Sequence, residues 1–135
     1  MNSKFNGGVY IDKKTRTIIQ NCTINRMVVI NEAKVTMSNS MVTAHSDFQD
    51  EATCEATRVS FMGNMNYEYF LALSGNAHLR GHDFLLHPNG ADLAIQDEAK
   101  LHTNVIADKD EKLSVECHKR PNVYILGIQW TAKKK

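Results

Sequence analysis

The sequence predicts an all-β fold, a short right-handed parallel β-helix (solenoid) of about five to six coils with capped ends. Three observations support this fold class. Apolar residues mostly alternate at a period of two, and Val, Ile and Thr are frequent, which is typical of strands. A triplet of a small, a basic and an apolar residue returns every 20 to 24 positions. Turn residues separate short apolar segments.

The repeated triplet sets the expected register of the coils. It occurs at Ala33–Val35, Thr57–Val59, Ala77–Leu79 and Ala99–Leu101, with starts 24, 20 and 22 positions apart. Each coil of a parallel stack lies on the one before, so the same coil position has the same surroundings in successive coils. We therefore expect an inward column of small first residues, an inward column of aliphatic third residues, and middle residues that point outward.

Two further apolar segments complete each expected coil. The segment ahead of the triplet recurs at residues 28–30, 69–73, 93–95 and 113–115. The segment behind it recurs at residues 41–42, 84–86 and 105–107. Leu73, Ile95 and Val115 are 22 and 20 positions apart and are expected to stack. A sandwich or a small barrel has strands of similar length, but neither requires the triplet to return at a fixed interval.

The N-terminal region resembles a known family. The segments Asn6–Ile11 and Thr17–Ile24 resemble the opening coils of pectin-lyase-like right-handed β-helix proteins, which include phage tailspike and adhesin modules. The motifs in these segments have low specificity, so the resemblance implies the fold and nothing about activity.

The whole chain, residues 1–135, is expected to form one domain. Both ends of a coil stack need covers, because an open coil exposes its core and its strand edges. The expected parts are an N-terminal cap (1–15), the coils (16–122), a C-terminal capping strand (123–131) and a tail (132–135). If the region from Gln49 to Tyr67 is a helix, the alternative is an α+β domain with a rolled sheet.

Composition and charge exclude several classes of protein. Hydrophobic residues make up 42% of the chain, which is enough for a core. The formal net charge of +1 provides no bulk attraction to nucleic acid or an anionic membrane. No apolar run approaches the roughly 18 residues of a membrane span. Cys22, Cys54 and Cys117 lack CxxC spacing and follow a start without a signal region, so we expect a cytoplasmic protein, in the host cytoplasm if phage-encoded.

The middle residues of the triplets form the most specific candidate site. These residues are Lys34, Arg58, His78 and Lys100. Like charges about 4.8 Å apart repel, so a face without a role would be expected to mix signs. We predict a stripe that binds an acidic protein surface or a protein–nucleic acid complex. The residues expected to extend it are Arg80, His102 and His118. The alternative is a solvated face on which Lys and Arg stems cover apolar surface.

No catalytic residue, metal site or cofactor is predicted. His78 and His82 have a spacing that suits one face of a helix, where we expect a strand, although coils could bring them near His102. The cysteines have no spacing that identifies a catalytic dyad. No outward coil position repeats Asp or Glu, as a glycan-cleaving β-helix would require.

These features favour a non-catalytic macromolecule-binding protein that uses one rigid face of the β-helix. A narrower hypothesis is a phage-encoded inhibitor of a host nuclease or defence complex. One alternative is an oligomeric phage tail or spike module, in which β-helices pack side by side or end to end as a homo-oligomer. A second alternative is a small polysaccharide lyase or hydrolase.

Overall fold

The chain winds into a parallel β-solenoid of about four turns. The computed structural model describes residues 4–63, 69–87, 91–105, 112–117, 123–126 and 129–133. Within these ranges every strand pair is parallel and no helix occurs. The described residues therefore include no helix with the length and apolar character that crossing a membrane requires. The predicted fold class is confirmed, with somewhat fewer turns than expected.

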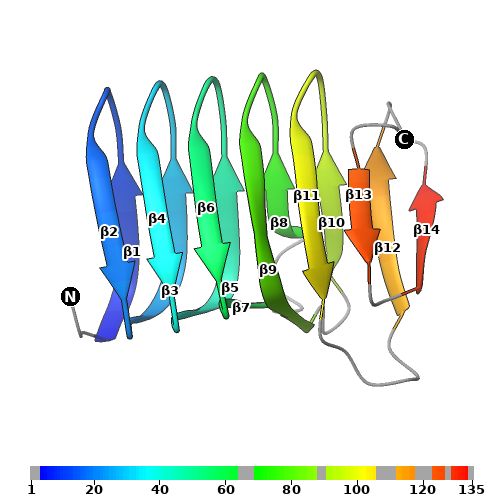
Figure 1. Ribbon diagram of the computed structural model, residues 1–135, viewed down its shortest axis with the longest axis horizontal. Helices are drawn as coiled ribbons and strands as arrows, with labels where there is room; N and C mark the ends of the chain where they lie inside the picture. Colours follow the sequence, from blue (N-terminus) through cyan, green and yellow to red (C-terminus); the bar gives the residue numbers. More distant parts are fainter. Residues whose placement is uncertain are drawn as a thin grey trace.

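The strands lie in two layers, which we call the front sheet and the back sheet from their positions in Figure 1. The front sheet contains β2 (Arg16–Gln20), β4 (Lys34–Ser38), β6 (Thr53–Thr57), β9 (His78–His87), β11 (Lys100–Val105) and β13 (Val123–Leu126). The back sheet contains β1 (Lys4–Ile11), β3 (Thr23–Val29), β5 (Met41–Phe48), β8 (Tyr69–Leu73), β10 (Asp92–Ile95), β12 (Lys112–Cys117) and β14 (Gln129–Lys133). The short β7 (Ser60–Met62) pairs with the start of β5 and the end of β9.

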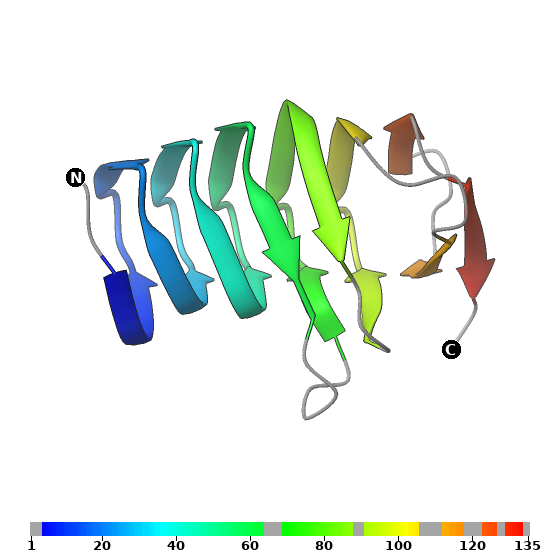
Figure 2. The ribbon, with the colours of Figure 1, turned by 90° about the horizontal axis from the view of Figure 1, so that it is seen from below.

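Figure 2 shows the two sheets from below, and the buried hydrophobic residues of both sheets form one core cluster. Along most of the described strands, buried and more exposed residues alternate, because successive side chains of a strand point to opposite faces. The predicted column of small inward residues is confirmed for Ala33, Ala77 and Ala99, each fully buried. Its remaining member is Ala52, which replaces the expected Thr57.

The triplet at Thr57–Val59 does not mark a coil, and the expected register is wrong there. Lys34 pairs with Thr53, 19 positions later, and Thr53 pairs with His78, 25 positions later. Coil length therefore changes along the chain, and a constant period misplaces this turn. Cys54 consequently takes the inward place expected for Val59.

Residues in the left-handed conformation mark two corners of the coils. The corner from back to front sheet has Lys13, Asn31, Asp50, Gly75 and Asp97, with φ from 57° to 66°. The corner that follows the front strands has Asn21, Asn39, Arg58 and Asp83, with φ from 51° to 59°. Gly, Asn and Asp adopt this conformation at low cost, so their positions determine where the chain turns.

The other expected elements are only partly reproduced. Leu73 pairs with Ile95 as predicted, but Ile95 pairs with Cys117, and Val115 pairs with Leu93. The described part of the region 49–67 contains β6 and β7, so the helical alternative is wrong for residues 49–63. Within the segments expected to cap the solenoid, β1 pairs with β3, β13 with β11 and β14 with β12, and all three continue the sheets.

Candidate binding face

The outward side chains of the front sheet form three columns, each following one ladder position from coil to coil. The first column contains Arg16, Lys34, Thr53, His78 and Lys100. The second contains Ile18, Thr36, Glu55, Arg80, His102 and Tyr124. The third contains Gln20, Ser38, Thr57 and His82, and beyond a register shift between β9 and β11 it continues with Asn104 and Leu126. Neighbours within a column are about 4.8 Å apart along the stack.

The structure brings five of the seven predicted site residues to this face. Lys34, His78 and Lys100 share the first column, with Thr53 between Lys34 and His78. The neighbouring second column contains Arg80 and His102, which pair with each other.

Arg58 does not belong to the predicted basic column. It lies at the corner after β6 with φ of 53°, and its backbone N–H donates to the carbonyl oxygen of His82 at 3.2 Å. The reason is the shorter coil, which places Thr53 rather than Arg58 beside Lys34. His118, expected to extend the stripe, lies outside the described residues.

Sequence reasoning missed Arg16 and Tyr124, which begin the first column and end the second. Arg16 pairs with Lys34, 18 positions later. The corner asparagines Asn21 and Asn39 have the same spacing, and they were the signal that could have extended the register to the first coil.

Positive charge is concentrated on the front sheet. Its described outward lysines and arginines are Arg16, Lys34, Arg80 and Lys100. In the three columns the described carboxylate is Glu55, which forms an ion pair with Arg80. With histidine neutral, the columns therefore have a net charge of +3, whereas the whole chain has a net charge of only +1.

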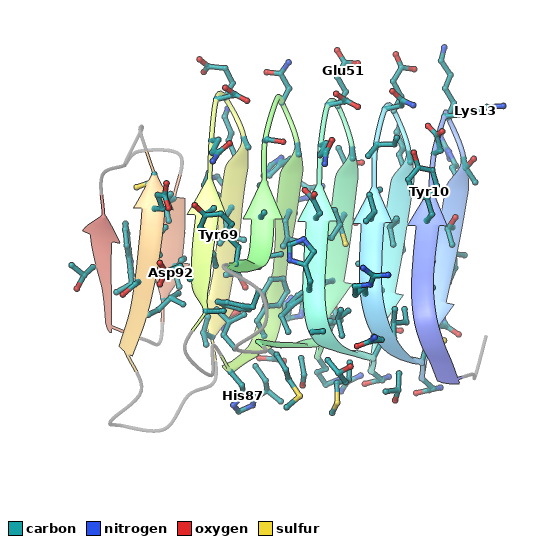
Figure 3. All side chains as sticks on the ribbon, turned by 180° about the vertical axis from the view of Figure 1, so that it is seen from behind. Tyr10, Lys13, Glu51, Tyr69, His87 and Asp92 are labelled. Atoms are coloured by element: carbon teal, nitrogen blue, oxygen red, sulfur yellow. The ribbon has the colours of Figure 1, made fainter. Side chains whose placement is uncertain are left out.

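Much of the balancing negative charge lies along the corner between back and front sheets, which we call the acidic edge. The carboxylates there are Glu32, Asp50, Glu51, Asp97 and Glu98. Lys13 and Lys14 begin the same edge, and Lys14 Nζ lies 3.4 Å from a carboxylate oxygen of Glu32. Figure 3 shows Lys13 and Glu51 standing outward along this edge. The two signs of charge are thus only partly separated, because the acidic edge borders the first column and Glu32 and Glu51 line one depression together with Arg16 and Lys34.

Three rings form a continuous group across the last coils of the front sheet. The ring centroids of His78 and His102 are 5.3 Å apart at 87°, and those of His102 and Tyr124 are 5.9 Å apart at 67°. Edge-to-face contacts of this kind fix the orientation of the rings. Arg80, His102 and Tyr124 also line a shallow open depression with Gly81 at its base.

The surroundings of His78 keep its ring neutral. Burial lowers the pKa of His78, and the neighbouring His102, Arg80 and Lys100 lower it further, while Glu55 opposes them. Its Nε2 atom is buried and has no hydrogen-bond partner among the described residues. The cation count of the face at neutral pH therefore does not include His78.

Little on this face is suited to nucleophilic or metal chemistry. Burial raises the pKa of the Cys54 thiol far above its ordinary value, so the reactive thiolate is disfavoured. Glu55 is engaged by Arg80. In the described parts of the chain, no group of three or more His, Cys, Asp or Glu side chains is placed to hold a metal ion.

Comparison of the chain with protein-family models, with curated proteins and with solved structures finds no match. The geometry and charge of the front sheet are therefore the basis for an argument about function.

Proposed function

We propose that this protein is a non-catalytic binding protein whose front sheet contacts an acidic surface of another protein. The observation that supports this proposal is the uneven distribution of charge: the three outward columns have a net charge of +3, with histidine neutral, in a chain with a net charge of +1. Like charges in neighbouring coils repel, and an acidic partner would relieve that cost.

A rigid sheet is well suited to this role. The outward side chains project from backbone that is hydrogen-bonded in the ladders on both sides in the middle coils, so little backbone ordering is needed on binding. The ring group of His78, His102 and Tyr124 adds orientated, partly apolar contact area beside Arg80 and Lys100. Electrostatic attraction would steer the partner toward this face.

The composition of the face favours a protein partner over nucleic acid. Exposed apolar side chains, Ile18, Tyr124 and Leu126, accompany the cations, and Glu55 interrupts them. Protein interfaces have this mixture of aromatic, apolar and charged groups, whereas nucleic-acid interfaces are much more positively charged. The narrower hypothesis, a phage-encoded inhibitor of a host nuclease or defence complex, stays a prediction.

A charge-reversal experiment tests the proposal. The front variant combines Arg16→Glu, Lys34→Glu and Lys100→Glu, all at exposed positions. The control combines Lys13→Glu, Lys14→Glu and Arg26→Glu, also exposed but off the front sheet, with the same change in net charge. We expect the front variant to capture about tenfold less partner from lysate, because charges on the binding face control association. The control should capture as much partner as the wild type.

Equal capture by the two variants, each shown to be folded by circular dichroism, would contradict a role for the front sheet. Treatment of the lysate with nuclease separates the partner classes. Capture that survives nuclease supports a protein partner. Capture that disappears, together with salt-dependent binding of a labelled oligonucleotide, would replace the acidic protein by nucleic acid.

A further inference from the structure

The first coil presents strand edges that have no partner among the described residues. β2 pairs only with β4, and β1 pairs only with β3. The backbone N–H and C=O groups on the outer side of such strands can accept another strand, and proteins usually protect such edges with proline, a bulge or an inward charge. β2, with the sequence RTIIQ, has neither proline nor an inward charge.

The two most exposed large hydrophobic residues of the described chain lie on these two strands. Tyr10 on β1 is 64% exposed, and Ile18 on β2 is 63% exposed. In the middle coils the second front column, which begins with Ile18, continues with Thr36, Glu55 and Arg80. Apolar residues occur at this column position only near the ends, and Ile18 beside an unpaired edge provides apolar area that a second strand can cover.

β2 is complementary to itself when a second β2 runs antiparallel to it. With Ile18 opposite Ile18 of the second copy, Arg16 lies opposite Gln20, and Thr17 lies opposite Ile19. Residues opposite one another in an antiparallel pair point to the same face. This pairing places outward residues opposite outward residues, because Arg16, Ile18 and Gln20 point outward while Thr17 and Ile19 are more buried. The antiparallel arrangement also keeps the two Arg16 side chains at opposite ends of the pair.

A head-to-tail arrangement fits less well. The described back sheet has one strand more than the front sheet, because β14 follows β12 while no described strand follows β13. The C-terminal end is therefore stepped. A second copy that paired its β2 with β13 would place its β1 where β14 already lies.

We propose that the protein forms a two-fold symmetric dimer in which β2 of one copy pairs antiparallel with β2 of the other, centred on Ile18. The partner is a second copy of this chain, because the edge is self-complementary in facing and in apolar contact, and the pairing keeps the two Arg16 side chains apart. The two-fold axis is perpendicular to the front sheet, so the two binding faces point in the same direction and form one continuous surface.

Single cysteines give a test of the pairing. Residues directly opposite in an antiparallel pair have Cβ atoms about 4.5 to 5.5 Å apart, which is within reach of a disulfide after small adjustment. We expect Ile18→Cys to form a disulfide-linked dimer under mild oxidation. A mixture of the Arg16→Cys and Gln20→Cys variants should form a mixed dimer more readily than either variant alone. The native cysteines are buried and do not compete.

Sedimentation velocity provides the second measurement. The wild type should show a concentration-dependent dimer, and Ile18→Lys should shift it to monomer, because a lysine on the edge opposes strand pairing. The matched control is Thr36→Lys, at an exposed position of the same column inside the stack, which should leave the dimer unchanged.

Three outcomes would overturn the proposal. The first is a monomeric wild type at every concentration. The second is a dimer that survives Ile18→Lys and is lost with Leu126→Lys on β13. The third is a series of masses that grows beyond the dimer, since a two-fold interface closes on itself.

Discussion

At the residue scale, Gly81 shows how closely the coils approach one another. A Cβ atom at this position would lie 1.7 Å from the carbonyl oxygen of Ala56 in the preceding coil. The obstructing atom belongs to backbone, which cannot move without breaking the ladder between β6 and β9. Glycine at this inward position therefore fixes the spacing of the front sheet beneath the ring group.

Replacing this glycine should be costly. We expect Gly81→Ala to lower the free energy of unfolding by about 3 kcal/mol, as for severe overpacking of a core. Urea denaturation followed by circular dichroism measures the effect. The matched control is Gly8→Ala, whose Cβ would meet its nearest neighbour at an ordinary 3.6 Å. Equal stability of both variants would show that the two coils can separate locally.

The environment of His78 predicts how stability depends on pH. Burial and the neighbouring His102, Arg80 and Lys100 lower the pKa of His78 in the folded state. Between the lowered and the ordinary value, the unfolded chain binds a proton that the folded chain does not, so stability falls as the pH decreases through this range. The loss is complete below the folded pKa.

We therefore expect the wild type to lose more stability than His78→Gln when the pH is lowered from about 7.5 to about 5. The measurement is the urea midpoint of both proteins at each pH. A His82→Gln variant, altered at an exposed histidine of the same strand, controls for general effects of removing a histidine. Parallel pH profiles for the wild type and His78→Gln would contradict this assignment.

At the scale of the elements, the sequence was sufficient to identify strands and to pair β9 with β11. Ala77 and Ala99 each precede one of these strands, and the Lys100 N–H donates to the Ala77 carbonyl oxygen at 2.9 Å. The triplets at 77 and 99 gave the correct register because they occupy equivalent positions of successive coils, so that His78 pairs with Lys100. The register of β6 was not readable from the triplet, because Thr57, Arg58 and Val59 imitate it by chance.

The corner residues contained the missing information. Asn31 and Asp50 are 19 positions apart, the same interval as Lys34 and Thr53. A left-handed corner restricts residue type for a steric reason, whereas an outward position accepts any polar side chain. The corners are therefore a more reliable guide to register than the outward column. Arg58 concealed the pattern, because it occupies a corner where Asn would be expected.

Arg58 provides a prediction at this scale. Since its φ of 53° is unfavourable for most side chains, Arg58→Val should lower the free energy of unfolding by about 1 kcal/mol. Arg58→Asn should leave stability unchanged or slightly raised, and should not alter capture of the partner by the front sheet. Thermal and urea unfolding give the stabilities, and the capture assay gives the rest. A loss of capture in the folded Arg58→Asn variant would show that Arg58 belongs to the binding site.

At the scale of the whole molecule, stability is distributed along a stack in which each coil contacts its two neighbours. Strands β4 and β6 are paired on both sides, whereas β13 and β14 are each paired on one side among the described residues. Stability in such arrays is the sum of coil and interface contributions, so the ends open more easily than the middle.

Hydrogen exchange should report this gradient. We expect the amides of β4 and β6 to exchange most slowly, and those of β13 and β14 faster by about tenfold or more, because one interface fewer protects them. Exchange at peptide resolution by mass spectrometry measures the profile. A uniform rate in all strands would mean that the solenoid opens as one cooperative unit.

The overall shape was predictable, but the distribution of charge on it was only partly so. Periodicity and turn chemistry act locally and are visible in the chain, so the solenoid followed from them. The net positive face depends on which residues become neighbours across coils of unequal length. One error of register placed Arg58 on the predicted face. Arg16 and Tyr124 were missed because the predicted column was not extended to the first and last coils.

The three buried cysteines can report where the solenoid opens first. Cys22, Cys54 and Cys117 lie in early, middle and late coils and are at most 6% exposed. Reagents that label thiols can reach each of them only when its part of the stack comes apart. The order in which the three native thiols become labelled would therefore show, without any engineered cysteine, where along the solenoid unravelling begins.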